Sequence, residues 1–167
     1  EWSESALMRS NWNRNSPRLA VNFSNGKMIS ELSRKFGLVC GETTPKISVN
    51  GQLLNSTAAF GISCMQSDEE IEYLEIERKL DGGGLLTRQF LLSRVDRFLL
   101  IADAVVLPAD ADLSYSCRFP LAEGIEGLRE TETTEMYLLR KGRIQSLVLP
   151  LALPEWKVAR TNHSFEI

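Results

Sequence analysis

The segment whose residue types best suit contact with a saccharide is Asn11-Trp12-Asn13-Arg14. A flat indole ring can stack on the apolar face of a sugar, and amide and guanidinium groups can bond its hydroxyls. The sequence therefore predicts a carbohydrate-binding site formed by Trp12, Asn11, Asn13 and Arg14. An alternative is that Trp12 closes one end of the hydrophobic core, as we expect for Trp156.

A second unusual residue is Asp103, which lies within the apolar run 98–106. A buried carboxylate is costly without a partner, and Arg88, Arg94 and Arg97 are the candidates. Asp103 can be interpreted as a buried general acid with a raised pKa or as half of a structural ion pair. The structural interpretation is favoured because most buried carboxylates are structural. We expect Asp103 and Arg88 to form this buried pair.

The inventory of catalytic side chains is small. His163 is the only histidine, which argues against histidine-based hydrolases and sites with several histidine ligands. Glu75 and Glu77 share a strand face, as glycosidase carboxylates can, but such pairs are common on exposed strands. Asp110 and Asp112 are too few for a calcium site. We therefore predict no catalytic residue, metal or cofactor in this chain.

Composition places the chain among soluble globular proteins, with 167 residues, 43% of them hydrophobic and 25% charged. The net charge of −3 and the lack of a basic run argue against a nucleic-acid partner. The longest apolar run, 98–107, is interrupted by Asp103 and is shorter than the roughly 20 residues of a membrane span. No membrane span is predicted.

The three cysteines, Cys40, Cys64 and Cys117, are far apart and form no C-x-x-C pair. This spacing indicates neither a disulfide framework nor a zinc site, and buried thiols are the favoured interpretation. Because one disulfide plus one free thiol would also fit the count, the redox compartment stays open.

Short apolar segments that alternate with polar residues recur along the chain, separated by turn formers such as Asn50-Gly51. This pattern predicts an all-β fold, an antiparallel β-sandwich of the supersandwich kind, with at most one short helix. The helix would lie in 28–41, where Met28, Leu32 and Phe36 share a helical face, although a strand fits equally well. The expected strands are 19–23, 46–51, 52–54, 60–65, 74–80, 85–94, 98–106, 113–119, 135–139 and 143–149.

Residues 1–167 are expected to form a single β-sandwich domain, a fragment of a longer chain, because Phe165 and Ile167 alternate at its end. The glycine-rich segment 81–84 predicts a hairpin turn rather than a phosphate cradle, because it lacks a P-loop lysine and a following helix. Two registers are open for this hairpin, with Arg88 opposite either Glu77 or Arg78.

The segments 74–79, 87–94, 96–105 and 149–156, with the short strand and turn at 47–51, resemble the β-sandwich region of heparinase II/III-like polysaccharide lyases and related bacterial proteins. In that family an α/α toroid carries most of the catalytic residues and the sandwich packs against it. The resemblance implies a non-catalytic scaffold or glycan-contacting domain of a polysaccharide-processing protein. It also implies a polysaccharide or oligosaccharide and a helical domain of the parent chain as partners, in a periplasmic or extracellular location.

Three functional hypotheses stay open. A scaffold domain predicts an exposed apolar patch where a helical domain docks. An independent carbohydrate-binding module predicts exposed aromatic side chains that include Trp12. A lyase or glycosidase acting alone predicts a concave pocket with perturbed carboxylates around Asp103 or around Glu75 and Glu77. For a lyase, the possible bases are Tyr73, Tyr115, Tyr137 and His163.

Overall fold

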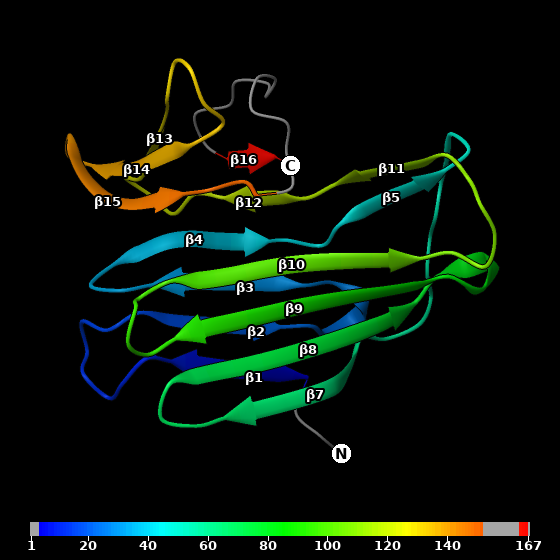
Figure 1. Cartoon of the computed structure of the whole chain (residues 1–167), viewed down its shortest axis with the longest axis horizontal. Helices are drawn as coiled ribbons and strands as arrows, with labels where there is room; N and C mark the ends of the chain where they lie inside the picture. Colours follow the sequence, from blue (N-terminus) through cyan, green and yellow to red (C-terminus); the bar gives the residue numbers. More distant parts are fainter. Residues whose placement is uncertain (1–3, 152–163, 167) are drawn as a thin grey trace.

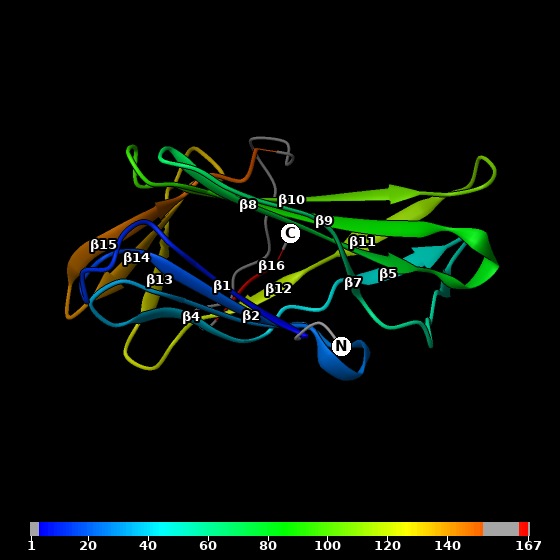
Figure 2. The same ribbon diagram turned by 90° about the horizontal axis from the view of Figure 1, so that it is seen from below.

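The computed structural model describes residues 4–151 and 164–166. Two four-stranded antiparallel sheets lie face to face and form the two layers of a sandwich (Figures 1 and 2). The first sheet has the strand order β1 (Ser5–Arg9), β2 (Arg18–Asn22), β3 (Ile29–Ser33) and β4 (Gly37–Glu42). The second sheet has the order β10 (Leu99–Val106), β9 (Leu85–Ser93), β8 (Ile71–Lys79) and β7 (Gly61–Ser67).

Three smaller sheets extend the sandwich on the side of β4 and β10 (Figure 1). One consists of β11 (Leu113–Ser116), β5 (Lys46–Val49) and β6 (Gln52–Leu53), and another pairs β12 (Arg118–Pro120) with β16 (Ser164–Glu166). The third, which we call the small sheet, consists of β13 (Glu126–Arg129), β14 (Met136–Arg140) and β15 (Arg143–Val148). The helical segments of the described residues are two 3-10 turns, Ser24–Gly26 and Asp81–Gly83. The predicted all-β, sandwich-like fold class is confirmed.

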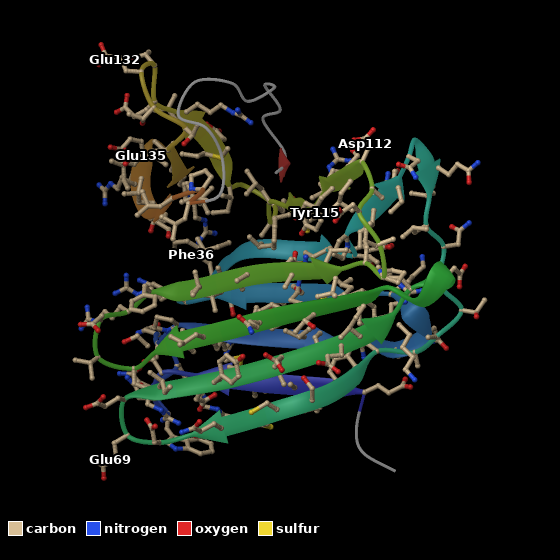
Figure 3. The ribbon with its side chains drawn as sticks, turned by 45° about the vertical axis from the view of Figure 1, so that its right-hand side comes forward. Phe36, Glu69, Asp112, Tyr115, Glu132 and Glu135 are labelled. Atoms are coloured by element: carbon tan, nitrogen blue, oxygen red, sulfur yellow. The ribbon has the colours of Figure 1, made fainter. Side chains whose placement is uncertain are left out.

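The main core lies between the two large sheets, where alternate residues of each strand point inward. Leu74 and Phe90 of the second sheet and Leu19 and Val21 of the first are at most 1% exposed. Burying each such side chain stabilises the fold by roughly 1.5–3 kcal/mol. A smaller cluster joins the small sheet to β4, and Phe36, below that sheet in Figure 3, packs against it.

The possible helix in 28–41 does not form, because these residues make the antiparallel pair β3 and β4. Met28 and Ser30 are both buried on the sandwich side. The Ser30 hydroxyl is satisfied there by Thr43, with an oxygen–oxygen distance of 2.7 Å. Strand neighbours on both sides of β3 therefore outweigh the weak helical periodicity.

Both registers drawn for the β8–β9 hairpin are wrong. The structure sets Glu77 opposite Thr87 and Arg88 opposite Ile76, so the loop spans 80–84. It is closed by a hydrogen bond of 2.8 Å from the backbone N–H of Leu80 to the carbonyl oxygen of Gly84. The longer loop is possible because Gly82 and Gly83 adopt φ angles of 81° and 85°, which favour glycine. Arg88 consequently points into the sandwich.

Candidate functional site

A cavity of about 310 Å³ lies at the end of the sandwich where loops of both large sheets meet, at the left of Figure 1. The β1–β2 loop supplies most of its wall, the β3–β4 loop adds Arg34, and the β9–β10 loop adds Arg94, Val95 and Arg97. The remaining lining residues are Ser10, Asn11, Asn13, Asn15, Ser16 and Pro17. The volume is at the lower end of the range of roughly 300–1,000 Å³ for small-molecule sites.

The β1–β2 loop holds its shape through its own asparagines. The side-chain oxygen of Asn11 accepts a hydrogen bond of 2.8 Å from the backbone N–H of Asn13 and another from the Ser16 hydroxyl. The side-chain oxygen of Asn13 accepts one of 3.1 Å from the N–H of Asn15. These bonds use the amide oxygens, as Asx turns do. Within the described residues the NH₂ groups of Asn11 and Asn13 have no protein partner, so they are available to a ligand.

Trp12 lies on the same loop and is 84% exposed, which shows that it does not close the core. The Arg9 guanidinium lies 4.0 Å from the centroid of the Trp12 ring, a cation–π contact that orients the indole. Arg14 is also exposed on this loop. The predicted residues Asn11 and Asn13 thus line the cavity, whereas Trp12 and Arg14 lie beside it without forming its wall.

The cavity wall is cationic, because it contains Arg34, Arg94 and Arg97 and no acidic residue. Arg94 is anchored: its Nη2 donates to Glu72 Oε1 at 2.7 Å and to Ser67 Oγ at 2.9 Å. Arg34 and Arg97 are exposed and join none of the ion pairs within the described residues. Two of the guanidinium charges therefore lack a carboxylate partner in that part of the chain.

Glu72 connects the anchored arginine to the first sheet. Its Oε2 accepts a hydrogen bond of 2.9 Å from the backbone N–H of Arg9, while its Oε1 accepts from Arg94. Arg94 in turn donates its backbone N–H to the carbonyl oxygen of Glu70 at 2.8 Å. This carboxylate therefore couples β1, β8 and the β9–β10 loop at the place where the cavity forms.

Asp103 lies away from this cavity, in a buried polar cluster with Arg88. Nε and Nη2 of Arg88 each donate to one Asp103 oxygen at 2.6 Å, and Nη1 donates to the carbonyl oxygen of Thr43 at 2.6 Å. Tyr115, which reaches from β11 toward the sandwich in Figure 3, donates its hydroxyl to Asp103 Oδ2. With its oxygens occupied in this way, Asp103 has the environment of a structural ion pair rather than of a proton donor to substrate.

On the outer face of the second sheet, Glu75 accepts hydrogen bonds of 2.7 Å from the Tyr73 hydroxyl, 2.8 Å from Gln89 Nε2 and 2.8 Å from the Ser63 hydroxyl. These three hydrogen bonds lower the pKa of Glu75, and the bond from Tyr73 has the largest effect. Burial and the bond to Glu75 raise the pKa of Tyr73 to about 12. Glu75 therefore stays ionised and Tyr73 stays protonated at neutral pH, so neither group is suited to proton transfer there.

The other candidate bases and ligands do not join a site in the described residues. Burial, followed by the charge of Asp103, raises the pKa of Tyr115. Asp110 and Asp112 are exposed, and no cluster of three metal-ligating side chains occurs within 4–151. His163 and Trp156 lie outside the described residues.

The expectation of three buried thiols is wrong for two of them. Cys40 on β4 and Cys64 on β7 are exposed, and only Cys117 is buried; all three are free. Cys40 lies opposite Glu31 and Cys64 lies opposite Glu75, on the outer faces of the two sheets. The apolar composition of these segments does not indicate which face a thiol occupies. No helix among the described residues is long and apolar enough to cross a membrane.

Sequence analysis missed Arg34, Arg94 and Arg97 as a group, because they are far apart in the chain and converge only through the loops of two sheets. The three arginines share one sequence feature, since each lies in a turn that follows a strand of the sandwich. This feature is weak evidence for a common site. No protein-family model, curated protein or solved structure matches this chain.

Proposed function

We propose that this chain is a glycan-contacting β-sandwich domain and that the cavity at the end of the sandwich binds an acidic saccharide. The observation that carries the proposal is the combination of three arginines and free asparagine amides around a cavity of about 310 Å³. The resemblance to the sandwich of heparinase II/III-like polysaccharide lyases supports the same context, a protein that processes a polysaccharide.

The charge of the cavity favours an anionic ligand over a neutral one. Guanidinium groups bind carboxylate and sulfate oxygens through paired, charge-assisted hydrogen bonds. A neutral sugar would cover Arg34 and Arg97 without compensating their charges, at a cost in desolvation. Because the chain has a net charge of −3, this positive site is a local feature and not a consequence of overall composition.

Trp12 adds the apolar surface that arginine and amide groups lack. Its side chain is 84% exposed, and the guanidinium group of Arg9 lies beside the ring. A sugar stacked on the indole would therefore present its acidic group to a cationic neighbourhood. This arrangement fits a polymer that extends from the cavity across the β1–β2 loop.

A glycan array tests the proposal, with uronate-containing and sulfated glycans compared with neutral ones of the same length. We expect saturable binding of the acidic glycans only, weakened by salt because the contacts are ionic. Isothermal titration with the best ligand should show losses of at least about tenfold for Trp12→Ala and for Arg97→Ala.

Two matched variants control for general surface effects. Leu151 is 82% exposed, as Trp12 is, and Arg143 on β15 is exposed, as Arg97 is, but neither lines the cavity. Leu151→Ala and Arg143→Ala should bind like wild type. Equal binding of neutral and acidic glycans, or no binding by a folded domain, would contradict the proposal.

A second candidate function, a scaffold that packs against a helical domain of a parent chain, is favoured by the outer face of the small sheet. Leu128, Tyr137 and Leu147 lie directly opposite one another across its three strands. Leu128 and Leu147 are 56% and 44% exposed, and Ile144 nearby is 63% exposed. Slower hydrogen exchange of β13–β15 in a longer chain than in this one would support the scaffold, whereas unchanged exchange would count against it.

A further inference from the structure

Strand β7 is an open edge of the second sheet, and it lies along the lower margin of Figure 1. Within the described residues its only strand neighbour is β8. All seven of its residues, Gly61–Ser67, are exposed. The side of β7 away from β8 therefore presents backbone N–H and C=O groups that another strand could pair.

The edge also lacks the charges that normally discourage such pairing. Natural edge strands are protected by lysine, proline, short length or bulges. Residues 52–67 contain no charged residue and no proline, although 25% of the chain is charged. The one protective feature is a bulge, where Ser63 and Cys64 together lie opposite Glu75.

The inward face of β7 is apolar and uncovered. Ile62 and Met65 lie opposite Ile76 and Leu74, which are fully buried, so all four point to the core side of the sheet. Ile62 is nevertheless 37% exposed and Met65 59% exposed. The reason is an offset between the sheets: β1, the edge of the first sheet, contacts β8, and β7 overhangs it.

We propose that β7 pairs antiparallel with β7 of a second copy of this chain, so that the two second sheets form one continuous sheet. With the two-fold axis between Ser63 and Cys64, Ile62 lies opposite Met65 of the second copy, and Met65 opposite Ile62. Directly opposite residues share a sheet face, so the four overhanging side chains bury one another. A two-fold interface requires this self-complementarity, and the uncharged edge supplies it.

The acidic residues of β8 do not oppose this pairing strongly. The β8 strands of the two copies would be three strand spacings apart, roughly 14 Å at about 4.8 Å each. This exceeds the screening length of about 8 Å at physiological ionic strength. The interface contains no ion pair, so added salt should leave the dimer unchanged or strengthen it slightly.

Sedimentation velocity across micromolar to sub-millimolar concentrations tests the proposal, with Met65→Lys as the disrupting variant. In the dimer, the lysine of each copy would lie opposite Ile62 of the other copy, among apolar side chains. We therefore expect the dimer dissociation constant to rise at least about tenfold. Leu128→Lys is the matched control, because Leu128 is 56% exposed on the small sheet, and it should dimerise like wild type. A monomer at every concentration, or equal loss in both variants, would overturn the proposal.

Cross-linking gives a second measurement that does not depend on the folding of Met65→Lys. In a Cys40→Ser background, Cys64 is the only exposed free cysteine of the described residues, since Cys117 is buried. A short bis-maleimide, which adds to thiols without oxidation, should join Cys64 of the two copies into a covalent dimer. Cys64→Ser in the same background should give none, and absence of cross-linked dimer in the Cys64 protein would count against β7 pairing.

Discussion

Arg88 and Asp103 lie directly opposite each other on β9 and β10 and form a bidentate ion pair with two nitrogen–oxygen distances of 2.6 Å. The Arg88 side chain is fully buried, and that of Asp103 is 10% exposed. Burial disfavours the charge of Arg88, but the hydrogen bonds and charge of Asp103 outweigh it and hold the pKa of Arg88 above its ordinary value. The pair also links the second sheet to Thr43 and to Tyr115.

Asp103→Ala should lower the free energy of unfolding by about 3–5 kcal/mol, because it leaves the Arg88 charge buried without a partner. The double variant Arg88→Met, Asp103→Leu should recover much of this loss, since both charges are then absent. Urea unfolding of the three proteins measures the effect. An unfolding free energy in Asp103→Ala equal to that of wild type would show that the pair is not structurally important.

Arg78 is a second residue with a structural role, and lysine should not be able to replace it. Its guanidinium donates to the carbonyl oxygens of Ala58, Gly26 and Ser56. Lysine keeps the charge but cannot reach three separate acceptors with a planar fork. We expect Arg78→Lys to reduce the free energy of unfolding by about 1–3 kcal/mol.

Hydrogen exchange locates this effect. Amide exchange should quicken in 24–27 and 56–60, the two segments that Arg78 joins, while β13–β15 stay protected. A stability loss that spreads evenly over both regions would mean that Arg78 acts through the core rather than through these loops.

The fold should lose stability at alkaline pH partly through Tyr73. Its pKa rises from the ordinary value of 10.0 to about 12 in the folded chain, so the folded state retains the proton more tightly than the unfolded state. This contribution is complete below pH 10 and is lost as pH rises toward about 12. Tyr73→Phe should remove it.

The measurement is the free energy of unfolding of wild type and Tyr73→Phe at several alkaline pH values. The wild-type value should fall more steeply with pH than that of the variant. Tyr115, whose pKa is also raised, is present in both proteins, so the difference between the two curves reports Tyr73. Parallel curves for the two proteins would contradict an elevated pKa of Tyr73.

Substitutions at Asn11 should separate loop folding from ligand binding. Asn11→Asp keeps the oxygen that accepts from Asn13 and Ser16 but replaces the free NH₂ donor by a negative charge. Asn11→Ala removes both functions. We expect Asn11→Asp to fold like wild type and to bind acidic glycans at least about tenfold more weakly, because like charges repel.

Two readouts check this expectation. In a Trp2→Phe, Trp156→Phe background Trp12 is the one remaining tryptophan, so its fluorescence reports the loop. This signal should change in Asn11→Ala but not in Asn11→Asp. Titration with the best acidic glycan reports the cavity. If Asn11→Asp binds acidic glycans as well as wild type does, the cavity does not hold the anionic group.

Local pattern was sufficient for most of the strands. The alternation of Leu74 and Ile76 with charged residues predicted the inward face of β8, and both are buried. Asn50-Gly51 predicted a tight hairpin, and their φ angles of 49° and 77° are those of such a turn. Strands β1 and β13 were not predicted, because their short segments carry little alternation and acquire partners only from β2 and β14.

The sequence by itself determined the all-β class, the unusual placement of a carboxylate at Asp103 and the aromatic, amide and guanidinium composition of the β1–β2 loop. The sequence favoured Arg88 among three arginines as the partner of Asp103. Only the tertiary structure decided that the two lie directly opposite each other, because a one-residue change of register turns every side chain of a strand to the other face. It likewise brought Arg34 of one sheet to Arg94 and Arg97 of the other. The loops of a sandwich come together because the two sheets pack against each other. The residue pattern along one strand carries no information about which loops of the two sheets lie close together.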